Sequence, residues 1–174
     1  QFWVNGRRAQ IAREPNEFYH YILGEADEGK DPVTGKLRDL GRILLTTDKK
    51  AVECLAGLSA KELDEAMVHV WWAWETEWRR PYFADTANSG IYLTSPLTRS
   101  IFMWPKYCPR VTIENTRKAL DAPGEWFLDR AKSEVLYIPR EGEDISTAVG
   151  IAPVVRRFLS VDKADTVWID GIAF

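Results

Sequence analysis

The feature that most constrains the fold of this chain is a pair of apolar runs separated by a short polar stretch. The first run lies within Pro123–Arg130, the second is Val135–Ile138, and Pro139 follows it. An apolar strand, a polar turn and a second strand that ends at a proline are typical of a β-hairpin. The sequence therefore predicts an antiparallel hairpin over residues 123–139, with Asp129-Arg130 as a turn cap or surface ion pair and, less favoured, as a ligand contact.

Other short apolar runs follow the same pattern along the chain. Asn5-Gly6 separates two such runs, and this dipeptide favours a tight hairpin because both turn positions need a positive φ. Turn-forming residues also separate Pro81–Asp85 from Gly90–Thr94. Further strands are predicted at residues 43–45, 110–114, 154–161 and 166–169. The fold class predicted from these patterns is mostly β with minor α, rich in antiparallel hairpins.

Helix signals are few. Ser59 is followed three residues later by Glu62, which is the pattern of a capping box, and it predicts a short helix over Ser59–Ala66. Asn115 is expected to cap a single helical turn that runs through Leu120. Residues 24–41 contain several glycines and a proline, which indicate a long loop.

The segment Met67–Trp78 is expected to be one long strand. Period-two alternation then puts its even residues on one face, which is almost wholly apolar and predicts a buried core face. These even residues are Val68, Val70, Trp72, Trp74, Thr76 and Trp78. The odd residues, on the opposite face, are Met67, His69, Trp71, Ala73, Glu75 and Glu77.

The odd face is the best local candidate for a site. Trp71 beside His69, Glu75 and Glu77 suits a sugar, because an aromatic ring stacks on the apolar face of a pyranose while carboxylates accept from its hydroxyls. Trp104, before a proline, is a second aromatic that would line a cleft. The favoured interpretation is nevertheless a solvated strand face with a partly covered Trp71, and packing for Trp104. Catalysis by the two glutamates is not expected, because a glycosidase pair must flank its substrate rather than lie side by side.

Composition excludes several classes of function. The chain has 174 residues, 45% of them hydrophobic and 28% charged, so it is expected to fold around a core. A net charge of −3 argues against a nucleic-acid groove, and no apolar run is long enough to span a bilayer. Cys54 and Cys108 lack the spacing of a zinc site, and no cofactor motif is present. Whether the two cysteines pair or stay reduced is left open.

Three phrases together resemble a family. These are Val4-Asn5-Gly6-Arg7-Arg8-Ala9 with the following Ala12–Asn16, the hairpin phrase Pro123–Pro139, and the closing Val161–Phe174. In this order they are similar to the opening, a middle hairpin and the first coil of bacterial right-handed parallel β-helix, pectin-lyase-like carbohydrate-active proteins, which include glycoside hydrolases. The turn Ala131–Glu134 lacks the glycine expected in that family.

The resemblance implies a division of the chain and a role for it. Residues 1–153 would be a β-rich accessory domain and residues 154–174 the start of a β-helix coil. The family's catalytic carboxylates lie on later coils, so no catalytic residue is assigned and the segment is expected to be non-catalytic, in a secreted or periplasmic protein that acts on polysaccharides. Two alternatives stay open: a free-standing carbohydrate-binding module, and a structural or assembly domain without a ligand.

Overall fold

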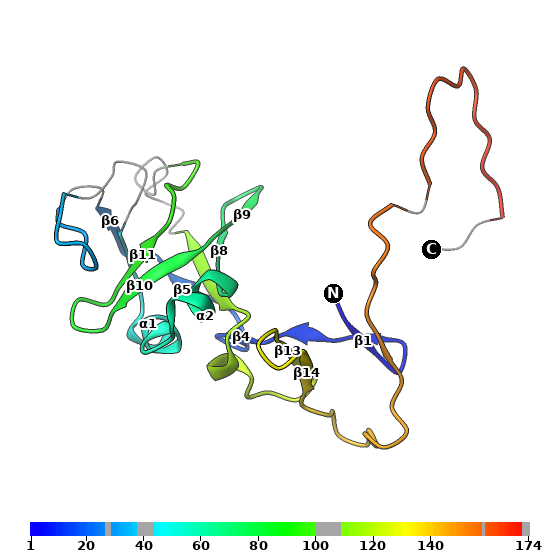
Figure 1. The fold of residues 1–174 in the computed structure, drawn as a ribbon, viewed down its shortest axis with the longest axis horizontal. Helices are drawn as coiled ribbons and strands as arrows, with labels where there is room; N and C mark the ends of the chain where they lie inside the picture. Colours follow the sequence, from blue (N-terminus) through cyan, green and yellow to red (C-terminus); the bar gives the residue numbers. More distant parts are fainter. Residues whose placement is uncertain (27–28, 38–43, 100–108, 158, 172–174) are drawn as a thin grey trace.

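The computed structural model describes residues 1–26, 29–37, 44–99, 109–157 and 159–171, and over these residues the protein is mostly β (Figure 1). The helices are α1 (Lys49–Leu55), α2 (Ala60–Glu65) and the 3₁₀ turn η2 (Arg117–Ala119). The strands are β1 (Trp3–Val4), β2 (Arg7–Arg8), β3 (Gln10–Ile11), β4 (Arg13–Glu14), β5 (His20–Tyr21), β6 (Gly24–Ala26), β7 (Leu44–Thr46), β8 (Met67–Trp71), β9 (Thr76–Arg79), β10 (Pro81–Asp85), β11 (Gly90–Leu93), β12 (Arg110–Glu114), β13 (Glu125–Asp129), β14 (Glu134–Tyr137) and β15 (Gly150–Ile151).

The described strands form small sheets with mainly antiparallel pairing. The central sheet has the order β4-β12-β8-β9, with β5 also paired to β12, and the second sheet has the order β10-β11-β7-β6. Two three-stranded sheets, β14-β13-β3 and β15-β1-β2, lie beside this body. Between named strands of the described chain, the parallel pairing is that of β3 with β13. The antiparallel, hairpin-rich part of the predicted fold class is therefore confirmed, and the described residues do not show a parallel β-helix.

The hydrophobic core lies between the central sheet, the second sheet and the two helices. Val68 and Val70 of β8 and Ile113 of β12 have no exposed surface, and neither does Ile91 of β11. Leu55 of α1 packs into the same cluster. Alternation along β8 and β12 puts these apolar residues on one sheet face, so the opposite face is left for polar and aromatic side chains.

The hairpins predicted from turn residues are present. Asn5 and Gly6 have φ values of 50° and 75° between β1 and β2, as the Asn-Gly signal requires. In the hairpin of β13 and β14, Ser133 takes φ = 56°, so serine occupies the left-handed position of the turn that lacks a glycine. Asp129 caps this turn by accepting a hydrogen bond from the Lys132 amide at 3.1 Å.

The strand predicted over Met67–Trp78 is wrong in one respect: it is two strands joined by a turn. β8 ends at Trp71 and β9 begins at Thr76, and the pair forms an antiparallel hairpin in which His69 lies opposite Trp78. The turn reverses the chain and shifts the phase of alternation, so even residues of β9 share a face with odd residues of β8. Trp78 is therefore 51% exposed and Trp74, in the turn, is 86% exposed.

The predicted helix after Ser59 is present as α2. The Ser59 side chain accepts from the Glu62 amide, and the Glu62 carboxylate accepts from the Ser59 amide, so both halves of the capping box are formed. Helix α1 was not predicted, although Asp48 caps it by accepting from Lys50 N. The turn η2 is capped by Thr116, not by Asn115.

The C-terminal segment differs most from its prediction. Residues 154–161 and 166–169 were predicted as strands, but the described residues from 152 to 171 form none. This segment leads away from the folded body in Figure 1 and is exposed along its described length. A strand needs a neighbour to complete its ladder, and no described strand lies beside this segment.

Candidate functional site

The predicted site residues His69 and Trp71 lie on the face of the central sheet that points away from the core. Register places Thr112 of β12 opposite His69 on one side and Trp78 of β9 opposite it on the other. Residues directly opposite one another in an antiparallel pair share a face, so these four side chains lie together. We call the set His69, Trp71, Trp78 and Thr112 the aromatic face.

The His69 ring is held between two indoles. Its centroid lies 4.1 Å from that of Trp71 and 4.3 Å from that of Trp78, with interplanar angles of 30° and 28°. His69 is only 5% exposed, whereas Trp78, on the edge strand, is 51% exposed. The stack therefore fixes the position of an indole that remains open to solvent.

A chain of hydrogen bonds sets the orientation of the His69 ring. Trp71 Nε1 donates to Thr112 Oγ1 at 3.4 Å, and that hydroxyl donates to Glu114 Oε1 at 2.9 Å. His69 Nδ1 lies 2.9 Å from the same carboxylate oxygen. Because a carboxylate only accepts, Nδ1 carries a proton, and among the described residues Nε2 is a buried nitrogen without a hydrogen-bond partner. These hydrogen bonds fix the His69 ring relative to Thr112 and Glu114.

Tyr19 extends the aromatic face toward two arginines. Its ring lies 5.5 Å from Trp71 in an edge-on arrangement. The Arg110 guanidinium lies 4.9 Å from the Tyr19 centroid, and that of Arg13 lies 5.8 Å from it. Both distances are within the range of cation–π attraction, so the Tyr19 ring stabilises both guanidinium groups.

The two glutamates predicted to flank Trp71 do not lie together. Glu75 is exposed in the turn and forms an ion pair with Arg99. Glu77 is buried on the opposite face, where it accepts from Trp72 Nε1 at 2.7 Å and pairs with Arg79 at 2.6 Å. The prediction that both glutamates share a face with Trp71 is wrong, because the turn after Trp71 shifts the alternation. Trp104 lies outside the described residues.

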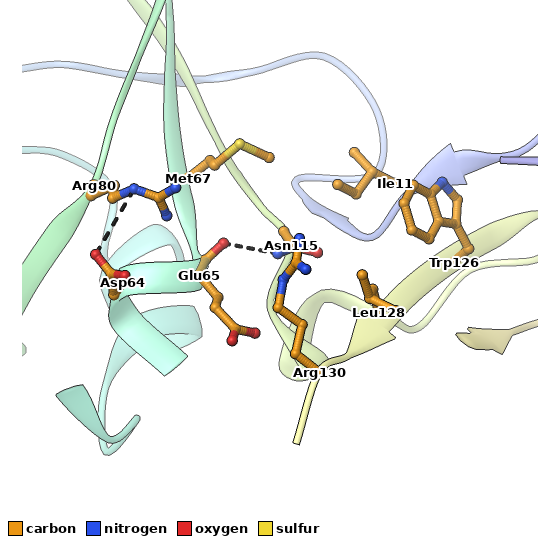
Figure 2. Close-up of a pocket in the computed structure, with 9 residues that line it drawn as sticks. All are labelled: Ile11, Asp64, Glu65, Met67, Arg80, Asn115, Trp126, Leu128 and Arg130. Carbon is orange, nitrogen blue, oxygen red and sulfur yellow. Dashed lines mark hydrogen bonds and ion pairs between the residues drawn. The ribbon is translucent and has the colours of Figure 1, made fainter. Parts of the chain in front are cut away.

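A groove at the start of β8 was not predicted. It has a volume of about 380 Å³ and is lined by Ile11, Asp64, Glu65, Met67, Arg80, Asn115, Trp126, Leu128 and Arg130 (Figure 2). One wall comes from the end of α2 and the start of β8, and the other from β3 and β13. Trp126 and Leu128 are two residues apart on β13, so both point to the groove side of that strand. The alternation of Trp126, Leu128 and Arg130 is the sequence pattern that indicates which residues share this side of the strand.

Asn115 connects both walls of the groove. Its Nδ2 donates to the Glu65 carbonyl at 2.8 Å, and its amide donates to the Ala12 carbonyl at 2.9 Å. Asn115 has φ = 60°, a left-handed conformation that asparagine tolerates better than most residues. These two hydrogen bonds fix two chain segments that are far apart in sequence, one on each side of Asn115.

Glu125 fixes the second wall from behind. Its carboxylate accepts from the amide of Arg13 at 3.1 Å and from the amides of Asp121 and Ala122 at 3.2 and 3.1 Å. Burial raises the pKa of Glu125, and the backbone donors oppose that rise. Since the Glu125 carboxylate oxygens accept hydrogen bonds from backbone amides, Glu125 has a structural role.

No cluster of histidine, cysteine, aspartate and glutamate that could hold a metal ion occurs among the residues that the structure describes. The Cys54 thiol is buried 3.1 Å from Thr116 Oγ1, and burial raises its pKa, which disfavours the reactive thiolate. In the described ranges, no helix has the length and apolar character needed to cross a membrane.

Comparisons with known proteins add one likeness in structure. No protein-family model and no curated protein sequence matches the chain. A solved structure described as "Glycoside hydrolase" matches with a TM-score of 0.62 and 22% sequence identity. The match covers 89% of this chain and 26% of the other, so the chain spans about a quarter of that protein's length. The likeness shows a shared fold over this region.

Proposed function

We propose that the chain is an accessory, non-catalytic domain of a glycoside hydrolase or a related polysaccharide-active protein. The observation that carries this proposal is the extent of the structural match: nearly all of this chain is covered, against about a quarter of a glycoside hydrolase. A fold that recurs as one part of a larger hydrolase suits a domain that supports or extends the substrate site of its parent.

Two surfaces support a role in contacting carbohydrate. The aromatic face presents the exposed indole of Trp78, and the groove presents the half-buried indole of Trp126 beside polar side chains. Sugar sites combine an aromatic ring for the C–H face of the pyranose with polar groups for its hydroxyls. The acidic side chains beside the aromatic face are engaged in ion pairs and structural hydrogen bonds, which favours binding over hydrolysis.

The C-terminal segment supports a location of this domain next to another part of its parent protein. Val154 and Trp168 are each 88% exposed, and other apolar residues between them are about half exposed. Exposed apolar surface of this extent is typical of an interface. In our proposal, residues 154–174 begin the first coil of a right-handed parallel β-helix, and later coils cover these side chains. A polysaccharide-active parent of this kind acts outside the cytoplasm.

The proposal is tested with the purified chain and a panel of soluble plant and bacterial polysaccharides. We expect the chain to be retarded in affinity electrophoresis by at least one of them, and to release no reducing ends from any of them on prolonged incubation. Release of reducing ends that survives repurification would overturn the non-catalytic assignment. Absence of retardation by the whole panel would favour a structural domain without a ligand.

A further inference from the structure

The groove in Figure 2 holds two charged groups that lack partners. Asp64 and Arg80 pair loosely at 3.9 Å, but within the described chain neither the Glu65 carboxylate nor the Arg130 guanidinium forms an ion pair or side-chain hydrogen bond. Glu65 is half-buried, and its own backbone carbonyl is already held by Asn115. A carboxylate and a guanidinium are thus both free to bind a ligand in one groove.

The charges of the groove balance. Asp64 and Glu65 supply two negative charges, and Arg80 and Arg130 supply two positive charges. An anionic ligand would meet the two carboxylates, and a cationic one would meet the two guanidiniums. Hydroxyl groups avoid both conflicts, because each one donates to a carboxylate and accepts from a guanidinium. The lining therefore favours a neutral ligand rich in hydroxyls.

The apolar part of the groove completes the requirements of a sugar ring. Trp126 lies beside Ile11 on one wall, with Leu128 next to it and Met67 across from it. Phe2 packs against the Trp126 indole with ring centroids 5.7 Å apart, which holds the indole in place. The volume of about 380 Å³ lies within the roughly 300–1,000 Å³ range of small-molecule sites.

We propose that this groove binds one or two residues of a neutral glycan. The pyranose ring stacks on Trp126, and its hydroxyls donate to Glu65 and accept from Arg130. This inference rests on the proposed carbohydrate function, to which it adds a location in the chain and the chemical class of the sugar.

The test is isothermal titration of the full chain with neutral xylotetraose, cellotetraose and mannotetraose, and with anionic tetragalacturonate. We expect at least one neutral probe to bind more tightly than the anionic probe. Trp126→Ala, Glu65→Gln and Arg130→Gln are each expected to weaken that binding about tenfold or more, since each removes one of the three contacts. The matched controls Trp168→Ala and Arg7→Gln change exposed residues elsewhere and are expected to bind as the unchanged chain does.

The outcomes separate this inference from the function on which it rests. Circular dichroism and the melting temperature establish whether each variant is folded. If Trp126→Ala does not fold, Glu65→Gln and Arg130→Gln provide the test. If the groove variants bind normally while Trp78→Ala does not, the groove is overturned and the carbohydrate function stands. Tighter binding of tetragalacturonate overturns the neutral class. Failure of every probe, together with failure of the polysaccharide panel, overturns the proposed function itself.

Discussion

Glu114 is the residue on which the aromatic face depends. It is 7% exposed and accepts hydrogen bonds from His69 and from Thr112. Burial acts to raise its pKa, but these hydrogen bonds and the electrostatic attraction of His69 and Arg13 outweigh burial and lower the pKa below its ordinary value of 4.5. The ionised carboxylate is thus more stable in the folded protein than in the unfolded chain.

Replacing Glu114 with glutamine should destabilise the fold in a pH-dependent way. At pH 7 we expect a loss of about 1.5–3 kcal/mol in the free energy of unfolding, because hydrogen bonds to a buried charged acceptor are weakened. The contribution of a carboxylate with a lowered pKa is complete above its unfolded-state value and is lost as the pH falls through the lower folded-state value. The difference between Glu114→Gln and the unchanged chain should therefore shrink below pH 4.5.

Urea unfolding at pH values from 7 down to 3 measures this effect. Glu141→Gln is the control, because Glu141 is exposed and carries no structural hydrogen bond from its side chain among the described contacts. A gap between Glu114→Gln and the unchanged chain that stays constant across the whole pH range would contradict the role given to its charge.

At the scale of elements, the β8–β9 hairpin shows where periodicity works and where it stops. Alternation correctly places Val68 and Val70 in the core and His69 with Trp71 on the other face. It fails beyond Trp71, because the residues of the turn include no glycine, proline or asparagine that marks a chain reversal. The candidate-site residues before the turn were therefore predictable, and the exposure of Trp78 was not.

The groove illustrates a different limit. Its lining comes from residues near position 11, from positions 64–80 and from positions 115–130, and pairings such as Asn115 with Glu65 bring them together. Local patterns predicted the hairpin that carries Trp126 and the helix that carries Glu65. They contain no information on which elements pack against one another, so the groove itself emerges only in the folded structure.

The capping box of α2 gives a prediction at this scale. Ser59→Ala removes the side-chain acceptor for the Glu62 amide and the partner of the Glu62 carboxylate. Loss of an N-cap side chain costs about 0.5–2 kcal/mol, and a six-residue helix has little cooperativity of its own to offset it. We expect a fall of about 1 kcal/mol in the free energy of unfolding in urea.

The control is Ser160→Ala, in an exposed segment, which is expected to leave the free energy of unfolding unchanged. Equal stabilities for the two variants would show that the box is not needed.

The whole molecule consists of a folded body and an extended C-terminal segment (Figure 1). The last described strand is β15, which pairs with β1 by placing Gly150 opposite Val4 and Ile151 opposite Trp3. Beyond it, the described chain has no strand, and Val154, Val161 and Trp168 are all at least 51% exposed. The end of β15 is therefore the C-terminal boundary of the paired strands in the described chain.

This boundary predicts the result of two deletions that differ by only a few residues. Removing residues 152–174 should leave the melting temperature unchanged, because the described part of this segment forms no strand, and should reduce the binding of a hydrophobic dye, because exposed apolar side chains are lost. Removing residues 148–174 also deletes β15 and the Val149 amide that donates to Asn5 Oδ1 at 2.9 Å. The longer deletion should lower the melting temperature by several degrees, since about 1 kcal/mol shifts a domain of this size by a few degrees. Calorimetry compares the three chains, and equal destabilisation by both deletions would show that the segment after β15 packs on the body.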